Sequence, residues 1–106
     1  MTLNIKHRHV ELTEAIKAYV EKKMHALTKF ADLVNHADVE VGKESEHHKN
    51  GKVFICKAVL ELKDGQVIRV DREADDLYKA IDKVYDHAKQ QLTEIHRLQI
   101  DRDAAA

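Results

Sequence analysis

Lysines recur in two segments of this chain whose apolar residues have helical spacing, and their ammonium groups can bind phosphate. The two sets are Lys22, Lys23 and Lys29, and Lys79, Lys83 and Lys89. These lysines lie outside the apolar positions of both segments. Lysines that neutralise RNA phosphates release counterions, and a rigid scaffold reads RNA by its shape and backbone. The pattern is compatible with an RNA-binding surface but does not establish one. Solvated helix faces are the alternative, because Asp82 and Asp86 interleave with the second set.

Overall charge does not indicate a nucleic-acid binder. The chain has 18 Lys and Arg residues against 19 Asp and Glu residues, a formal net charge of −1. A strong positive excess is usual for such proteins. Any phosphate binding must therefore come from the local distribution of cations.

The sequence shows no arrangement of residues that is typical of a catalytic site. Ser45 is the one serine and lies in a polar stretch without a glycine-rich elbow. Cys56 falls on the apolar side of a predicted strand, where a thiol is normally a small core residue. The three glycines form no phosphate-binding loop. We predict no enzyme activity and no cofactor.

Histidines raise the possibility of metal binding. His7 and His9 lie two residues apart on an extended segment and would point the same way, and His47 and His48 are adjacent. A dedicated site needs three or four ligands, and no third ligand follows at a recognisable spacing. We predict no physiological metal site.

Size and composition indicate a single domain. The chain has 106 residues, 43% hydrophobic and 35% charged, which suits one modest core. It contains no apolar run of the ~20 residues that a transmembrane helix needs. The N-terminus lacks the apolar core of a signal peptide, and a single cysteine suits a reducing compartment. We expect a cytoplasmic protein with one domain over residues 1–100 and a short disordered tail over 101–106.

Hydrophobic periodicity predicts six elements. Strands are expected near residues 3–5, 37–43, 52–62 and 66–72, with Asp64-Gly65 as a tight hairpin turn between the last two. Thr13 is expected to cap a helix that ends near Lys29. Asp75 or Asp76 is expected to cap a second, longer helix.

The order of these elements predicts an α+β fold. The sequence β-α-β-β-β-α gives a four-stranded mixed sheet, and each strand and helix has one apolar side. Both helices most economically cover the same face of the sheet. The expected architecture is of the double-stranded-RNA-binding-domain type, with the outward sides of the helices side by side.

Three segments resemble the ribosome hibernation promoting factors of the short form. They are residues 3–5, residues 10–16 leading into the first helix, and residues 76–82, Asp-Leu-Tyr-Lys-Ala-Ile-Asp, leading into the second. Residues 90–92, Gln-Gln-Leu, resemble the Arg-Gln-Leu that is common there. The resemblance spans nearly the whole chain in order and length.

The resemblance implies a translation regulator. Such proteins bind the small ribosomal subunit in the channel of messenger RNA and transfer RNA, contacting ribosomal RNA through basic helix residues. They block translation and protect idle ribosomes in stationary phase or stress. The expected partners are the small subunit and its ribosomal RNA, with no membrane and no small-molecule substrate, and the free protein is expected to be monomeric.

The resemblance also bears on individual residues. Lys23 and Lys29 match expected basic positions of the first helix, and His87 replaces a lysine. The expected RNA-binding set is Lys22, Lys23, Lys29, Lys79, Lys83, His87 and Lys89. Relatives tend to have lysine or arginine where this chain has Ala26, Gln90 and Glu94. An imidazole facing phosphate would gain charge as the pH falls, which could strengthen binding in acid; a histidine without a role is the alternative.

A second hypothesis is a protein-interaction module or homodimer that uses the uncovered face of the sheet. Val53, Ile55, Val59 and Val67 would lie on that face. Clustered exposed apolar residues often mark an interface. Salt distinguishes the two hypotheses, since phosphate contacts weaken with added salt and apolar contacts do not.

Overall fold

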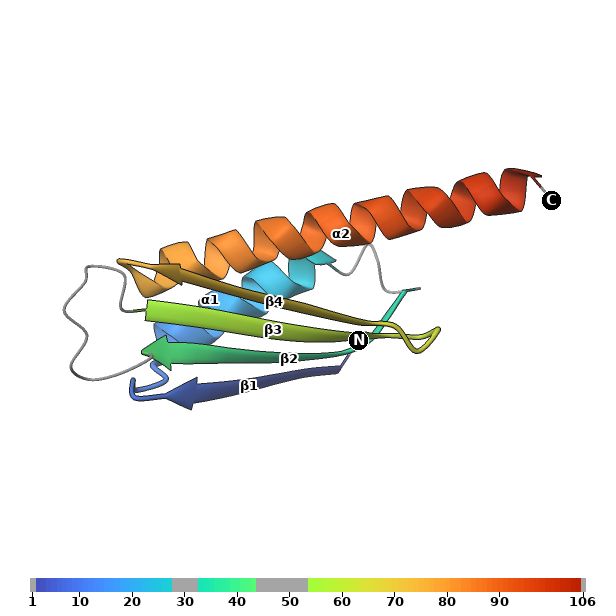
Figure 1. The fold of residues 1–106 in the computed structure, drawn as a ribbon. Coiled ribbons are helices and arrows are strands. Elements are labelled where there is room, and N and C mark those ends of the chain that lie inside the picture. The colour runs from blue at the N-terminus through green and yellow to red at the C-terminus, as the bar shows by residue number, and fades with distance from the viewer. Residues whose placement is uncertain (1, 28–32, 44–53, 106) are drawn as a thin grey trace.

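The computed structural model describes residues 2–27, 33–43 and 54–105, with only the backbone described for 99–105. Its elements are β1 (Thr2–Arg8), α1 (Glu14–His25), β2 (Val34–Lys43), β3 (Phe54–Leu62), β4 (Val67–Ala74) and α2 (Leu77–Ala105). Both helices lie on one face of the sheet (Figure 1). The predicted α+β fold, with a four-stranded mixed sheet and two helices, is confirmed; its likeness to double-stranded-RNA-binding domains stays a prediction.

The strands follow chain order across the sheet, β1-β2-β3-β4. β1 and β2 pair in parallel, as expected for strands joined through a helix, and the two later pairs are antiparallel. Helix α1 therefore crosses the covered face between β1 and β2. Helix α2 returns over the same face from the end of β4.

Side-chain caps fix where each helix begins. The Thr13 hydroxyl accepts a hydrogen bond from the Ile16 amide at 3.1 Å, as predicted. At α2, Asp76 Oδ1 accepts from the amide of Tyr78 at 2.7 Å and lies 3.4 Å from that of Lys79. Asp76, rather than Asp75, is thus the cap of α2.

The β3–β4 hairpin turns where the sequence predicted. Gly65 has a φ of +94°, a conformation that side chains disfavour, and its amide donates to the Leu62 carbonyl at 3.0 Å. Asp64 Oδ1 accepts from the Gln66 amide at 3.0 Å. This turn sets the register that pairs Leu60 with Ile68.

The core fills the space between the sheet and the helices. Its buried side chains come from α1, β2, β3, β4 and α2; large examples are Val20, Met24, Val39, Val41, Leu60, Ile81, Val84 and Leu92. Burying a side chain of this kind stabilises the fold by about 1.5–3 kcal/mol. No side chain of a polar or charged residue is buried among the described residues.

The start of β2 differs from prediction, and two other predicted element ends lie outside the described residues. α1 ends at His25, and the predicted end at Lys29 lies outside the described residues. β2 begins at Val34 rather than at Ala37, with a register shift between Val34 and His36 that the alternation of side chains does not reveal. The predicted strand start at 52 also lies outside the described residues.

Helix α2 continues to Ala105, where the sequence predicted a short disordered tail over 101–106. Its last residues include arginine and alanine, which have high helix propensity, and no glycine or proline interrupts them. Among the described residues, neither helix combines the length and apolar character that a membrane crossing requires.

Gly42 is the position where the parallel β1–β2 pair admits no side chain. It lies opposite Arg8, and a Cβ atom at Gly42 would sit 2.1 Å from the Arg8 carbonyl oxygen. We expect Gly42→Ala to lower the free energy of unfolding by about 2 kcal/mol, as overpacking does. Chemical denaturation measures it. Glu40→Ala, two residues earlier on the same strand, is the control and should change stability by less than about 0.5 kcal/mol. Equal stability of the two variants would contradict the close approach.

Candidate nucleic-acid interface

All three tyrosines of the chain meet where α1 and α2 lie side by side. Tyr19 belongs to α1, and Tyr78 and Tyr85 belong to α2. Together with Lys23 and Asp82 they form a surface that we call the tyrosine seam. Its residues follow helical spacing, since Lys23 comes four residues after Tyr19 and Asp82 four after Tyr78. Tyr19 and Tyr85 pack against the core, and Tyr78 is the most exposed of the three rings.

Asp82 is the polar centre of the seam. Its Oδ1 accepts a hydrogen bond from the Tyr19 hydroxyl at 2.5 Å and forms an ion pair with Lys23 Nζ at 3.3 Å. Both donors come from α1, so one carboxylate joins the two helices. The Asp82 side chain is 43% exposed and that of Lys23 is 26% exposed. The group is accessible from outside.

The aromatic rings enclose the Lys23 ammonium. Lys23 Nζ lies 5.6 Å from the centre of the Tyr19 ring and 5.0 Å from that of Tyr85. Tyr19 meets Tyr78 edge to face, with ring centres 5.0 Å apart and planes at 84°. These distances suit cation–π and aromatic contacts. The seam is therefore a packed, fixed cluster.

Protonation in the seam follows from these contacts. The hydrogen bond to Asp82, followed by burial, raises the pKa of Tyr19. Burial acts to lower the pKa of Lys23, but the hydrogen bond and charge of Asp82 outweigh it, so this pKa is raised. Both raised pKa values keep Tyr19 a phenol and Lys23 an ammonium at neutral pH.

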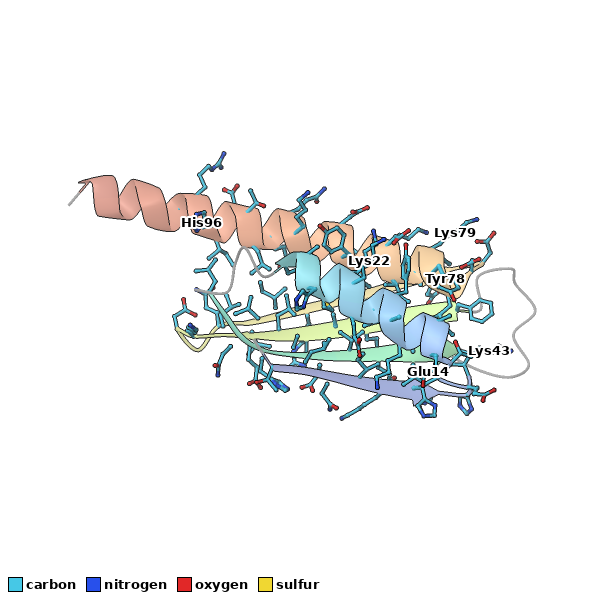
Figure 2. All side chains as sticks on the ribbon, turned by 180° about the vertical axis from the view of Figure 1, so that it is seen from behind. Glu14, Lys22, Lys43, Tyr78, Lys79 and His96 are labelled. Atoms are coloured by element: carbon cyan, nitrogen blue, oxygen red, sulfur yellow. The ribbon has the colours of Figure 1, made fainter. Side chains whose placement is uncertain are left out.

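Three of the predicted RNA-binding lysines lie at or beside the seam. Lys23 is part of it, Lys22 is the adjacent exposed residue of α1 (Figure 2), and Lys89 comes one turn after Tyr85 on α2. Lys22 and Lys89 have no ion-pair or hydrogen-bond partner among the described residues. Their charges are available to a ligand.

The other predicted cations lie apart from the seam. Lys79 Nζ pairs with Asp75 at 3.1 Å, which lowers the pKa of that carboxyl. Lys83 Nζ donates to the Glu73 carbonyl at 3.2 Å, on the β4 side of α2. Lys29 lies outside the described residues. The sequence prediction thus combined residues from two sides of α2.

His87 faces β4 rather than the seam. Its Nδ1 accepts from the Arg72 guanidinium at 2.7 Å, and the Gln91 amide contacts its Nε2. A guanidinium only donates, so Nδ1 carries no proton in this arrangement. A doubly protonated ring would break this contact. The role of His87 in phosphate binding stays a prediction, and its Arg72 partner is one that the sequence did not reveal.

Sequence reasoning missed the partners of these groups. Neither Arg72 nor Tyr19 was singled out from the sequence. The Lys79–Asp75 pair has the i,i+4 spacing that could have revealed it. Glu94 forms an ion pair with Arg97 at 2.7 Å.

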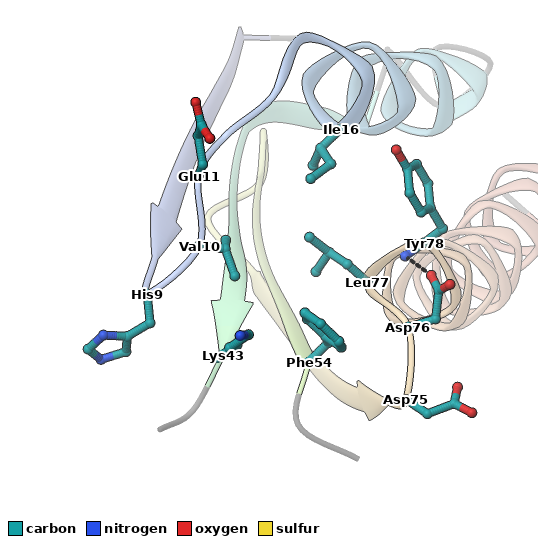
Figure 3. Close-up of a pocket in the computed structure, with 10 residues that line it drawn as sticks. All are labelled: His9, Val10, Glu11, Ile16, Lys43, Phe54, Asp75, Asp76, Leu77 and Tyr78. Atoms are coloured by element: carbon teal, nitrogen blue, oxygen red, sulfur yellow. Dashed lines mark hydrogen bonds between the residues drawn. The ribbon is translucent and has the colours of Figure 1, made fainter. Parts of the chain in front are cut away.

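A hollow of about 550 Å³ lies at the start of α2. Its apolar lining includes Val10, Phe54 and Leu77, and its rim is mostly acidic (Figure 3). Asp76 already caps the helix, and His9 points away from the hollow (Figure 3). The described residues place no nucleophile–base pair there.

Two of the described histidines make hydrogen bonds close to them in the chain, and the cysteine is buried. His7 Nδ1 lies 2.9 Å from the Val10 carbonyl, and His36 pairs with Asp38 at 3.0 Å. No group of three potential metal ligands occurs among the described residues, and His47, His48 and Ser45 lie outside them. Cys56 is fully buried, which raises its pKa to about 12.

The uncovered face of the sheet is charged rather than apolar across its centre. Lys6, Glu40, Lys57 and Asp71 lie opposite one another on the four strands and alternate in sign. Of the apolar residues predicted here, Ile55 is 8% exposed, Val59 is half-buried and Val67 is 47% exposed; Val53 lies outside the described residues. This face offers a partner little contiguous apolar surface.

Known proteins are similar to this chain in both sequence and fold. The family described as Sigma 54 modulation protein / S30EA ribosomal protein matches residues 3–99. A ribosome hibernation promoting factor of Acinetobacter guillouiae is 30% identical over 105 residues, 95% of this chain and 92% of that protein. The protein of the same name from Escherichia coli K12 is 33% identical over 93 residues, 88% and 90% of the two chains. The solved N-terminal domain of Thermus thermophilus Protein Y has a TM-score of 0.75 at 30% identity, covering 90% of this chain and 99% of that one.

Burial makes the Cys56 thiol unreactive in the folded protein. Only the thiolate attacks a disulfide reagent, and a pKa near 12 leaves almost none at pH 8. We expect the native protein to resist such a reagent at pH 8 for as long as it stays folded. The same protein in denaturant should react at once and serves as the control. Rapid labelling of the native protein would contradict the assigned burial.

Proposed function

The chain belongs to the Sigma 54 modulation protein / S30EA ribosomal protein family, and we propose that it is a ribosome hibernation factor. In this role it binds the small ribosomal subunit and its ribosomal RNA in the messenger and transfer RNA channel. It blocks translation and protects idle ribosomes in stationary phase or stress. Its place of action is the cytoplasm, and it acts by occupying the subunit rather than as an enzyme.

The observation that carries this proposal is the family match over residues 3–99, together with relatives named ribosome hibernation promoting factor that are covered over about nine tenths of their length. Fold and sequence agree over the same part of the chain, since the Protein Y domain matches 90% of it. The proposal therefore concerns the whole domain and not an isolated motif.

The two helices supply the surface that would contact RNA. Lys22 and Lys89 flank the tyrosine seam without partners among the described residues, so they can neutralise phosphates directly. Lys23 and Lys79 are paired with Asp82 and Asp75. The Lys79–Asp75 pair is exposed on both sides and adds little to stability, so phosphate can compete for Lys79 at small cost.

The remaining predicted contacts are secondary in this proposal. Lys83 and His87 lie on the β4 side of α2, where they would meet RNA that passes over that helix. Lys29 follows the described part of α1 and stays a prediction. The charged, uncovered sheet face then points away from the RNA and contributes rigidity.

Charge reversal of the two lysines beside the seam tests the RNA contact. We expect Lys22→Glu/Lys89→Glu to weaken cosedimentation with purified small subunits by more than about tenfold and to reduce the salt dependence of log K by about 2. The reason is the loss of two phosphate contacts. The matched control is Lys63→Glu/Arg69→Glu, which changes net charge equally at exposed positions away from the helices. If both double variants bind alike, the helical layer is not the RNA-binding surface.

Salt separates the proposed function from apolar association. The affinity of the parent protein for small subunits should fall by orders of magnitude when the salt concentration is raised several-fold, because counterion release drives binding. Equilibrium binding in a potassium chloride series measures this. Affinity that is insensitive to salt would instead indicate contact through apolar groups, as in the interaction-module hypothesis.

A further inference from the structure

Asp82 places a negative charge in the middle of a surface that should bind phosphate. Its Oδ1 is occupied by Tyr19 and Lys23, both from α1. Its Oδ2 receives no hydrogen bond from the described residues, and the side chain is 43% exposed. A carboxylate repels phosphate, so Oδ2 calls for a different ligand group. It can only accept, so that group must be a donor.

Nucleic-acid bases provide such donors on their edges. Cytosine, adenine and guanine each carry an amino group, and acidic side chains accept hydrogen bonds from the amino group of cytosine. Uracil presents a carbonyl oxygen where cytosine has its amino group, and that oxygen would be repelled. An exposed carboxylate on an RNA-binding surface therefore distinguishes bases that are otherwise the same size.

An aromatic ring lies next to this acceptor. Tyr78 is 37% exposed and precedes Asp82 by one helical turn. Its ring projects from the start of α2 toward α1 (Figure 3) and is fixed there by its edge-to-face contact with Tyr19. Exposed aromatic rings bind unpaired bases by stacking. The stacking surface and the hydrogen-bond acceptor are thus neighbours on one helix face.

The surroundings hold the acceptor in place and leave room for the RNA backbone. Tyr19 and Lys23 fix Asp82 from α1, and Lys23 is itself held between two rings. Lys22 and Lys89 flank the seam with free charges. A strand of RNA can place its phosphates on the flanking lysines while one base enters between them.

We propose that the tyrosine seam binds one unpaired RNA base that carries an amino group, with the base stacked on Tyr78 and the amino group donating to Asp82 Oδ2. The proposal rests on the proposed RNA-binding function and adds base recognition to contacts that otherwise read only shape and phosphate. Asp82 is then a specificity-determining residue as well as the link between the helices.

Short single-stranded homopolymers of cytidine and of uridine test the proposal, with binding measured by fluorescence anisotropy at fixed salt. The parent protein should bind the cytidine polymer about fivefold more tightly, at the low end expected for a good base contact. This comparison needs no variant and so does not depend on the folding of one. Equal affinities, or a preference for uridine, would overturn the proposal.

Variants assign the preference to the seam. Asp82→Asn should remove the preference for cytidine, because the amide has both a donor and an acceptor. Asp86→Asn, an exposed acid of the same helix outside the seam, should keep it. Tyr78→Leu should lower the affinity for both polymers about tenfold. Tyr78→Phe should keep the affinity of the parent, because stacking needs only the ring. A preference that survives in Asp82→Asn would overturn the proposal.

The same protein must also be tested on small subunits, which separates the two levels of inference. If the protein cosediments with small subunits but binds both homopolymers equally, or binds neither, base recognition is overturned and the proposed function stays in place. Failure to cosediment overturns both. A purely structural Asp82 would change the thermal stability of Asp82→Asn without changing the ratio of the two affinities.

Discussion

The sheet has one apolar face, and this constraint determines where everything else lies. Val39, Cys56 and Val70 point to the covered side, while the row from Lys6 to Asp71 makes the other side charged. Apolar area can be removed from water only if both helices share the covered face. The helices then lie next to each other, and their outward sides form a single surface. The candidate interface is a consequence of how the strands alternate.

Asp82 determines how the two helices are aligned within that layer. It joins the Tyr19 hydroxyl and the Lys23 ammonium of α1 to α2 through one oxygen. An exposed ion pair adds little to stability, so the value of this contact lies in orientation. It fixes the rings on either side of Lys23 and keeps that lysine from pointing freely into solvent. Among the described residues beside the seam, Lys22 and Lys89 are the lysines that keep unpaired charges.

Much of the fold could be predicted from the sequence because it depends on local signals. Thr13 and Gly65 fix a helix start and a turn through their own chemistry, and alternation identified β3 and β4. The site was harder to predict. Periodicity tells which stripe of a helix is buried but not which neighbour each flank of that stripe meets. The Tyr19–Asp82 contact joins residues 63 positions apart, and Lys83 faces β4 because of the rotation of α2.

A near-neutral protein must bind RNA differently from a strongly basic one. Long-range attraction scales with net charge, here −1, and salt screens it beyond about 8 Å at physiological ionic strength. Non-specific binding to any RNA should therefore be weak. Affinity then has to arise from contacts made at close range, where shape and the positions of individual cations matter. In the proposed RNA contact, the pairing of Lys23 and Lys79 with acids increases this dependence, because phosphate has to displace those acids to reach the lysines. The arrangement suits a protein that must find one structured RNA surface among many others.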